Sequence, residues 1–154
     1  MKKNLLLILS SLLLVACQGD VVYSKFGSIP SHGWEADSAL CFTPCINDTT
    51  ADYQLQMTLR HTDAYSYQNL WLFIQISKDS VVIDTDTIEC YLANDRGEWL
   101  GGGLTIHELP LLFEEHYHFD QTGEYSISIQ QGMRSDTLSG IKEVGVKIIN
   151  NGKE

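Results

Sequence analysis

Apolar and polar residues alternate without a break in Tyr53-Gln54-Leu55-Gln56-Met57-Thr58-Leu59-Arg60. A period of two is typical of a β-strand with one buried face, because successive side chains of a strand point to opposite sides. The stretch therefore predicts a half-buried strand. Its inward face is expected to carry Tyr53, Leu55, Met57 and Leu59.

The chain on either side of this stretch is also patterned as strands. Asn69–Ile76 is apolar on both faces, as in a central strand, and a turn at Ser77–Ser80 predicts that Val81–Thr87 returns as its hairpin partner. Further strands are expected at Thr87–Ala93, Glu115–Phe119, Glu124–Gln130 and Val144–Ile149. Only Leu104–Glu115 favours helix, and Pro110 limits it to one or two short turns. Short strands separated by turns predict an all-β antiparallel sandwich, either jelly-roll or immunoglobulin-like, with jelly-roll favoured by about eight strands.

The first seventeen residues, MKKNLLLILSSLLLVAC, have the pattern of a bacterial lipoprotein leader. Two lysines precede the apolar run Leu5–Val15, which is far shorter than the roughly 20 residues that a membrane-spanning helix needs. Leu14-Val15-Ala16-Cys17 then reads as a lipobox. We expect a signal peptide at 1–16, lipid attachment at Cys17, a short tether at 17–20 and a single β-sandwich domain at 21–150. Several acyl chains hold a protein stably to a bilayer.

Composition limits the partners. The formal charge is −10, and two of the ten basic residues belong to the leader, so the rest of the chain is more acidic still. Nucleic acid is therefore not an expected partner, because its phosphates require Lys and Arg. Three cysteines remain after Cys17, namely Cys41, Cys45 and Cys90. A disulfide between Cys41 and Cys45, or between Cys90 and either one, stays open, and their spacing is a poor zinc pattern.

Catalytic motifs are absent from the sequence. It contains no nucleophile elbow, phosphate-binding loop, HExxH motif or EF-hand loop. His116 and His118 would share a strand face and could chelate an ion, but they read more simply as solvent-facing. The spacing of Asp84, Asp86, Glu114 and Glu115 does not indicate a glycosidase pair. We expect no enzyme activity, no metal, no cofactor and no small-molecule substrate.

Two tryptophans are candidates for an interaction surface. Trp71 would lie opposite Leu70 and Leu72 on the central strand, so Trp71 and Phe73 either pack on another layer or form an exposed patch. If Trp71 and Trp99 lay exposed on one surface, they could stack sugars or dock a partner. A carbohydrate-binding lipoprotein is thus the alternative to a protein-interaction role.

Several segments taken together resemble the gliding-motility lipoprotein GldH family of Bacteroidetes bacteria. They are Trp34-x-x-Asp37 followed by Leu40 and Phe42; Tyr65-x-Tyr67-x-Asn69-Leu70-Trp71-Leu72-Phe73-Ile74; Asp86-Thr87; Leu92-Ala93-x-x-x-Gly97-x-Trp99-x-Gly101-x-Gly103; and Gln131-Gly132-Met133-Arg134-x-Asp136-x-Leu138-x-Gly140-Ile141-x-x-Val144-Gly145. The resemblance extends from the leader nearly to Ile149.

The resemblance implies an envelope lipoprotein needed for gliding and associated with the motility machinery and the linked type IX secretion system. It implies no catalytic residues, and Cys17 is the one functional position that it transfers. Within the motifs, Trp99 is expected to plug the end of the sandwich, and Arg134 and Asp136 to pair locally or cap a loop. Both are also candidates for an interaction face.

The residue after the lipidated cysteine bears on the membrane. Gln18 stands there rather than Asp, which can retain lipoproteins at the inner membrane in some bacteria. We therefore expect attachment to the outer membrane. The short tether has only Asp20 near its start, which is no strong acidic signal for export to the cell surface, so we expect the periplasmic face, with other envelope, motility or secretion proteins as partners.

Overall fold

The computed structural model describes residues 20–152, and these fold entirely into strands, turns and loops. The predicted signal peptide at 1–16 and the predicted lipid attachment at Cys17 lie outside the described residues. Between residues 20 and 152, no helix is long and apolar enough to cross a membrane.

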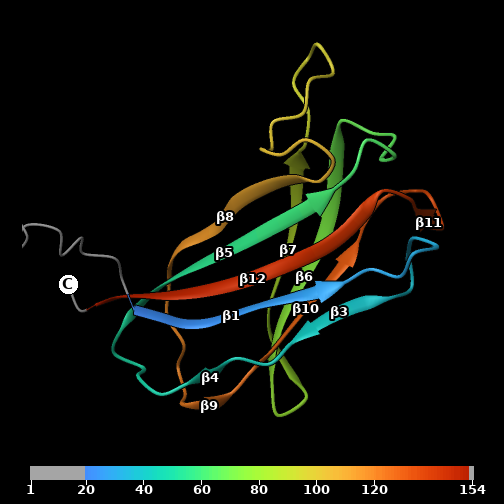
Figure 1. The fold of residues 1–154 in the computed structure, drawn as a ribbon. Helices are drawn as coiled ribbons and strands as arrows, with labels where there is room; N and C mark the ends of the chain where they lie inside the picture. Colours follow the sequence, from blue (N-terminus) through green and yellow to red (C-terminus); the bar gives the residue numbers. More distant parts are fainter. Residues whose placement is uncertain (1–19, 153–154) are drawn as a thin grey trace, which may run out of the picture.

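Two four-stranded antiparallel sheets form the sandwich (Figure 1). The first sheet contains, in spatial order, β1 (Asp20–Ser28), β12 (Ile141–Gly152), β5 (Asp52–His61) and β8 (His107–Tyr117). The second contains β3 (Ala39–Phe42), β10 (Ser126–Gln131), β6 (Asn69–Lys78) and β7 (Val81–Tyr91). Short pairs at the two ends join β2 (Trp34–Glu35) to β11 (Thr137–Leu138), and β4 (Cys45–Ile46) to β9 (Gly123–Glu124).

The order of these strands resolves the topology. Counting the eight long strands along the chain, the first sheet has the order 1-8-3-6 and the second 2-7-4-5. This is the order of a jelly roll, in which the chain passes back and forth between two sheets. The all-β sandwich predicted from the sequence is confirmed, and the jelly-roll form is the one that the structure adopts.

The core lies between the two sheets and is built by strand alternation. On β5, Leu55, Met57 and Leu59 are completely buried, and so are Leu70 and Leu72 on β6. Each of these side chains is worth about 1.5–3 kcal/mol of transfer free energy. The burial of one face of β5 is therefore the alternation of Tyr53–Arg60 expressed in three dimensions, as the sequence predicted.

The expectation of helical turns within residues 104–115 is wrong, since β8 occupies His107–Tyr117. Pro110 is on β8, an edge strand of the first sheet, and lies opposite Thr58 of β5. An edge strand tolerates proline because one side of its backbone has no ladder to complete. Pro110 therefore disfavours a helix at this position but is compatible with the strand that forms.

The hairpin between β6 and β7 follows the sequence prediction. Asp79 and Ser80 have φ values of 50° and 65°, and Lys78 and Val81 pair across the turn. Two central residues with positive φ are typical of the type I′ turn, whose twist matches that of the flanking strands. The turn therefore sets the register in which β7 runs beside β6.

Candidate functional site

A hollow of about 430 Å³ lies on the outward face of the second sheet, where β6 meets the turn that follows β10. We call it the aromatic groove. Its lining residues are Tyr67, Asn69, Trp71, Phe73, Gly132, Met133, Arg134 and Ser135. The two stretches that line it belong to two of the segments on which the family resemblance depends. Folding therefore brings these distant segments into one site.

Strand alternation explains the exposed rings of the aromatic groove. Because the inward face of β6 carries the buried residues Leu70 and Leu72, Trp71 and Phe73 must point outward. Their side chains remain 38% and 49% exposed, and Tyr67 just before the strand is 41% exposed. The sequence had left Trp71 and Phe73 between a further layer and an exposed patch, and the structure places them on the surface.

The far wall of the groove is held by a buried side chain. Gln131 is only 2% exposed, and its Oε1 accepts a hydrogen bond of 2.8 Å from the Met133 backbone N–H. Its Nε2 donates a bond of 2.9 Å to the Ser135 carbonyl. One amide thus fixes both ends of the turn that carries Met133 and Arg134, so this wall is organised without a ligand.

The floor of the groove is tightly packed around Gly132. The Gly132 N–H donates a 2.7 Å hydrogen bond to the Trp71 carbonyl, which draws the two segments together. A Cβ at this position would lie 3.0 Å from a ring carbon of Phe73 and 3.4 Å from the Cβ of Trp71. The absence of a side chain therefore allows the Phe73 ring to pack over the backbone.

Arg134 and Asp136 fall in neighbouring hollows. Arg134 lines the aromatic groove, whereas Asp136 lines an adjoining acidic hollow together with Glu35 and Asp37. No ion pair joins Arg134 to Asp136 or to any other residue from 20 to 152. The carbonyl of Asp136 accepts a 2.7 Å hydrogen bond from Ala36 N–H, which ties this loop to β2.

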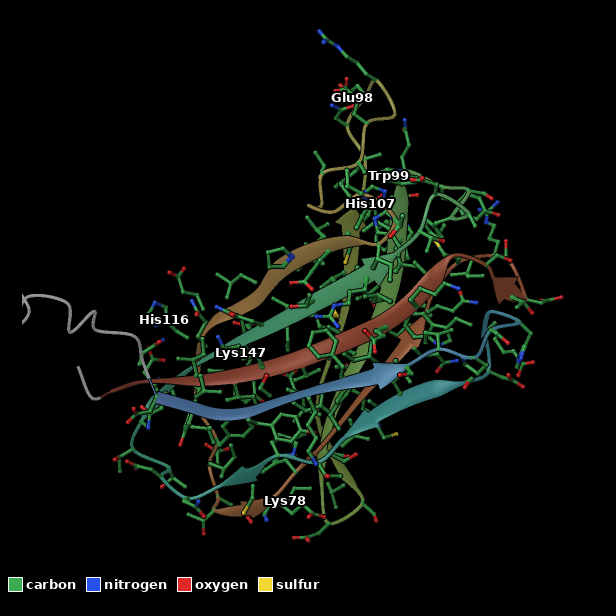
Figure 2. All side chains as sticks on the ribbon, viewed as in Figure 1. Lys78, Glu98, Trp99, His107, His116 and Lys147 are labelled. Atoms are coloured by element: carbon green, nitrogen blue, oxygen red, sulfur yellow. The ribbon has the colours of Figure 1, made fainter. Side chains whose placement is uncertain are left out.

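Trp99 lies away from the groove, in a second cluster at one end of the sandwich. Figure 2 shows Trp99 and His107 beside each other at the base of the long loop that carries Glu98 near its tip. The Trp99 ring packs edge-on against His61 with ring centroids 4.6 Å apart, and its Nε1 donates a 2.8 Å hydrogen bond to Asp63. Trp99 thus packs over the end of the core, and it is not among the residues that line the aromatic groove with Trp71.

This cluster encloses a buried histidine. His61 is fully buried, and its Nε2 has no hydrogen-bond partner within the described structure. Burial lowers the pKa of His61, which favours the neutral ring. Nearby, the hydrogen bond from His107 and then that from Trp99 lower the pKa of Asp63. The cluster therefore combines a neutral histidine with an ionised carboxylate, and sequence spacing gave no signal for it.

Comparison with known proteins identifies the family. The model of the GldH lipoprotein family matches residues 21–148. The gliding motility lipoprotein GldH homologue of Christiangramia forsetii is 34% identical over 149 residues, which cover 92% of this chain and 91% of that protein. The gliding motility lipoprotein GldH of Flavobacterium johnsoniae is 32% identical, with 96% of each chain covered.

The chain belongs to the GldH lipoprotein family. It is a homologue of gliding motility lipoproteins and a lipid-anchored protein of the cell envelope. The resemblance drawn from the motifs is confirmed.

Solved structures add no argument to this assignment. Dimeric latent PorU from Porphyromonas gingivalis matches with a TM-score of 0.35 and 8% identity, covering 88% of this chain and 14% of PorU. The CBM35 from Cellvibrio japonicus Abf62 matches with a TM-score of 0.39 and 12% identity, covering 90% of this chain and 95% of the CBM35. Both scores are too low to transfer any property.

In this GldH-family chain, His116 and His118 each contact protein groups near the start of β5. His116 Nδ1 lies 2.7 Å from Asp52 Oδ2, and His118 Nδ1 lies 3.2 Å from the Ala51 carbonyl. The hydrogen bond from His116 is the main reason that the pKa of Asp52 is lowered. Over residues 20–152, no group of three or more His, Cys, Asp or Glu side chains could hold a metal ion.

Three of the carboxylates considered from the sequence do come together. Asp84, Asp86 and Glu114 line one narrow hollow between β7 and β8, next to Tyr117. Its volume is about 20 Å³, which is room for about one water molecule. Burial, and then the charge of Asp84, raise the pKa of Tyr117 to about 12. A sugar ring cannot enter this hollow, so it does not form a glycosidase cleft.

The cysteines of the sandwich are free thiols. Cys41 and Cys45 are exposed, whereas Cys90 is buried at 3% exposure. Cys41 lies on β3 and Cys90 on β7, at opposite edges of the second sheet, so three strand spacings alone place them at least about 14 Å apart. This separation is far beyond the roughly 7 Å between Cα atoms that a disulfide allows.

Proposed function

We propose that this protein is a non-enzymatic interaction component of the gliding motility apparatus and of the linked type IX secretion machinery. Family membership supports the motility role. The aromatic groove supports action by binding, because its lining brings together rings, a thioether, a guanidinium, one amide and a serine hydroxyl, without a nucleophile beside a base or a pair of carboxylates. The groove is the contact site in this proposal, with Trp71 and Arg134 as its principal residues.

We further propose that Cys17 carries the lipid. An anchor at this position determines which end of the sandwich faces the membrane. Only Gln18 and Gly19 separate Cys17 from Asp20, where β1 begins, so the two ends of this link are at most about 11 Å apart. The end of the sandwich where β1 starts therefore lies close to the membrane.

The aromatic groove lies towards the opposite end of the molecule. The turn after Gln131 runs into β11, which pairs with β2 just beyond the far end of β1 (Figure 1). The nine residues of β1 span about 30 Å. The groove is thus directed away from the anchoring membrane, towards partners in the periplasm. Gln18 favours the outer membrane, and the tether, with only Asp20 near its start as an acidic residue, favours the periplasmic face.

The experiment that tests this function deletes the gene in a host that glides and secretes through the type IX system. We expect loss of colony spreading and of secreted cargo, with recovery on return of the full-length gene. Affinity capture of the lipidated protein from envelope extracts should retain motility or secretion proteins, and a Cys17→Ala form should leave the membrane fraction. Normal spreading and normal secretion after deletion would contradict the proposal.

A further inference from the structure

We propose that the aromatic groove binds a neutral oligosaccharide, such as a strand of envelope glycan. The inference rests on the proposal that this groove is the contact site, and it names the chemical class of the partner. Four properties of the groove lead to it: rings open to solvent, neutral polar side chains beside them, a single cation, and a β6 backbone that is paired on both sides.

The first property is a set of rings held open to solvent. Several large aromatic side chains elsewhere are buried, with Trp34, Tyr53 and Phe119 each 1% exposed, whereas Phe26 and Tyr91 are exposed singly at other places. Trp71 and Phe73 instead lie on the outward face of one strand, two residues apart, which spaces them about 7 Å along β6. Ring faces presented in a row can stack against the C–H faces of successive sugar units.

Neutral hydrogen-bonding side chains continue from the rings along the same face. Phe73 lines both the aromatic groove and a second hollow of about 160 Å³. The second hollow is bordered by Gln75, Thr85, Thr87, Ser128 and Gln130, with Asp86 as its one acidic residue. Amides and hydroxyls both donate and accept hydrogen bonds, as sugar hydroxyls do. The surface beside the rings therefore matches the polar edge of a glycan.

Charge selects a neutral sugar over an anionic one. The chain carries a formal charge of −10, and the acidic hollow with Glu35, Asp37 and Asp136 adjoins the groove. This field repels polyanions such as polyuronates. Arg134 is the one cation among the residues that line the groove, and it has no ion-pair partner in the described chain. Its guanidinium offers up to five N–H donors, which sugar hydroxyl and ring oxygens can accept.

Backbone pairing argues against an extended peptide as the occupant. A peptide that extends a sheet needs an unpaired strand edge. β6 is paired on both sides, with β10 and with β7, and the Trp71 carbonyl accepts the Gly132 N–H. Side chains must therefore do the recognition in this groove, which suits a stacked sugar better than an added strand.

The test measures binding by the full-length lipoprotein in a detergent without a sugar headgroup. The probes are cellohexaose, xylohexaose, mannohexaose and chitohexaose, with hexagalacturonate as the anionic comparison and a neutral hexapeptide as the peptide comparison. Isothermal titration gives the affinity, and quenching of tryptophan fluorescence reports stacking. We expect saturable binding of at least one neutral hexasaccharide and weaker binding of hexagalacturonate and the peptide.

Variants locate the binding site. Trp71→Ala should weaken binding about tenfold or more, because a stacked ring is lost. Arg134→Gln changes an exposed residue and should weaken binding severalfold without altering the fold. Leu112→Ala is the matched control, since Leu112 is 51% exposed on the other sheet, and it should bind as the wild type does. Circular dichroism and the melting temperature verify folding of each variant.

Absence of binding by every neutral hexasaccharide would overturn the inference. So would equal binding by the wild type and by both groove variants, or tighter binding of hexagalacturonate or the peptide. These results are distinct from those of the deletion. Lost gliding with no glycan binding keeps the machinery role and rejects the sugar, whereas glycan binding with normal gliding and secretion does the reverse.

Discussion

Gly140 should be hard to replace by alanine, and Gly97 offers a matched comparison. Both have positive φ, 90° and 78° respectively. A Cβ at Gly97 would meet nothing within 4 Å, whereas a Cβ at Gly140 would lie 2.3 Å from the Tyr65 nitrogen and 2.7 Å from the Ala64 carbonyl carbon. The substitution Gly97→Ala therefore isolates the conformational penalty, and Gly140→Ala adds a collision with backbone.

The magnitudes follow from these two contributions. A left-handed backbone costs an alanine about 1–2 kcal/mol. The collision at Gly140 can be relieved only by moving the turn at residues 62–65, and that movement breaks the 2.8 Å bond from Thr62 N–H to the Gly140 carbonyl. Overpacking of this kind adds about 1–3 kcal/mol, so Gly140→Ala should cost about 2–5 kcal/mol in total.

Thermal unfolding followed by circular dichroism on the full-length protein checks this prediction. We expect Gly97→Ala to lower the melting temperature by about 5 °C and Gly140→Ala to lower it by about 10 °C or more. Tyr67 packs on Tyr65 with ring centroids 5.7 Å apart, so the groove should also be disturbed in Gly140→Ala. Equal losses in the two variants would refute the argument from the backbone contact.

Three further predictions concern the histidine cluster, the groove wall and the thiols. Burial lowers the pKa of His61, so as pH falls the His61 ring is protonated in the unfolded chain before it is protonated in the folded protein. The free energy of unfolding should therefore decline below about pH 6.5, by at most about 1.4 kcal/mol per pH unit. Urea unfolding at pH 7.5 and 5.5 should show a smaller decline in His61→Gln, and the same decline in both proteins would exclude His61 as the cause. Gln131→Leu leaves Met133 N–H and the Ser135 carbonyl without their partner, so it should cost about 2 kcal/mol in urea unfolding and weaken groove binding, and unchanged stability would contradict the bracing role. Burial raises the pKa of Cys90 to about 12, whereas Cys41 and Cys45 are exposed. Iodoacetamide should therefore modify Cys41 and Cys45 in the native protein and reach Cys90 only after unfolding, as measured by mass spectrometry. Rapid modification of native Cys90 would contradict its protection by burial.

Much of the fold could be predicted because strand periodicity is a local signal. The alternation of Tyr53–Arg60 gave both the strand and its buried face, and the buried residues Leu70 and Leu72 left Trp71 to face outward. The prediction of helical turns at residues 104–115 was wrong, because a proline limits helix length wherever it stands but is compatible with some strands. Its tolerance on an edge strand depends on which strand lies beside it, and a single sequence does not state that.

The site was less predictable than the fold. Trp71 and Arg134 were both candidates, but their proximity depends on Gly132 reaching the Trp71 carbonyl and on Gln131 bracing the turn after β10. The hydrogen bond from Gly132 to Trp71 joins segments far apart in the sequence, and the alternation of apolar and polar residues carries no signal for it or for the Gln131 contacts. Residue type alone made Trp99 and Trp71 candidates for one exposed aromatic surface, whereas the hydrogen bond from Trp99 to Asp63 holds Trp99 in a different cluster.

The most direct measurement exchanges the chromosomal gene of a gliding host for Trp71→Ala and, in parallel, for Leu112→Ala. Colony spreading is then compared at equal amounts of lipoprotein in the envelope. If this family member acts through its groove, spreading is lost in Trp71→Ala and retained in Leu112→Ala. Normal spreading in Trp71→Ala would show that the work of this lipoprotein is done by another surface.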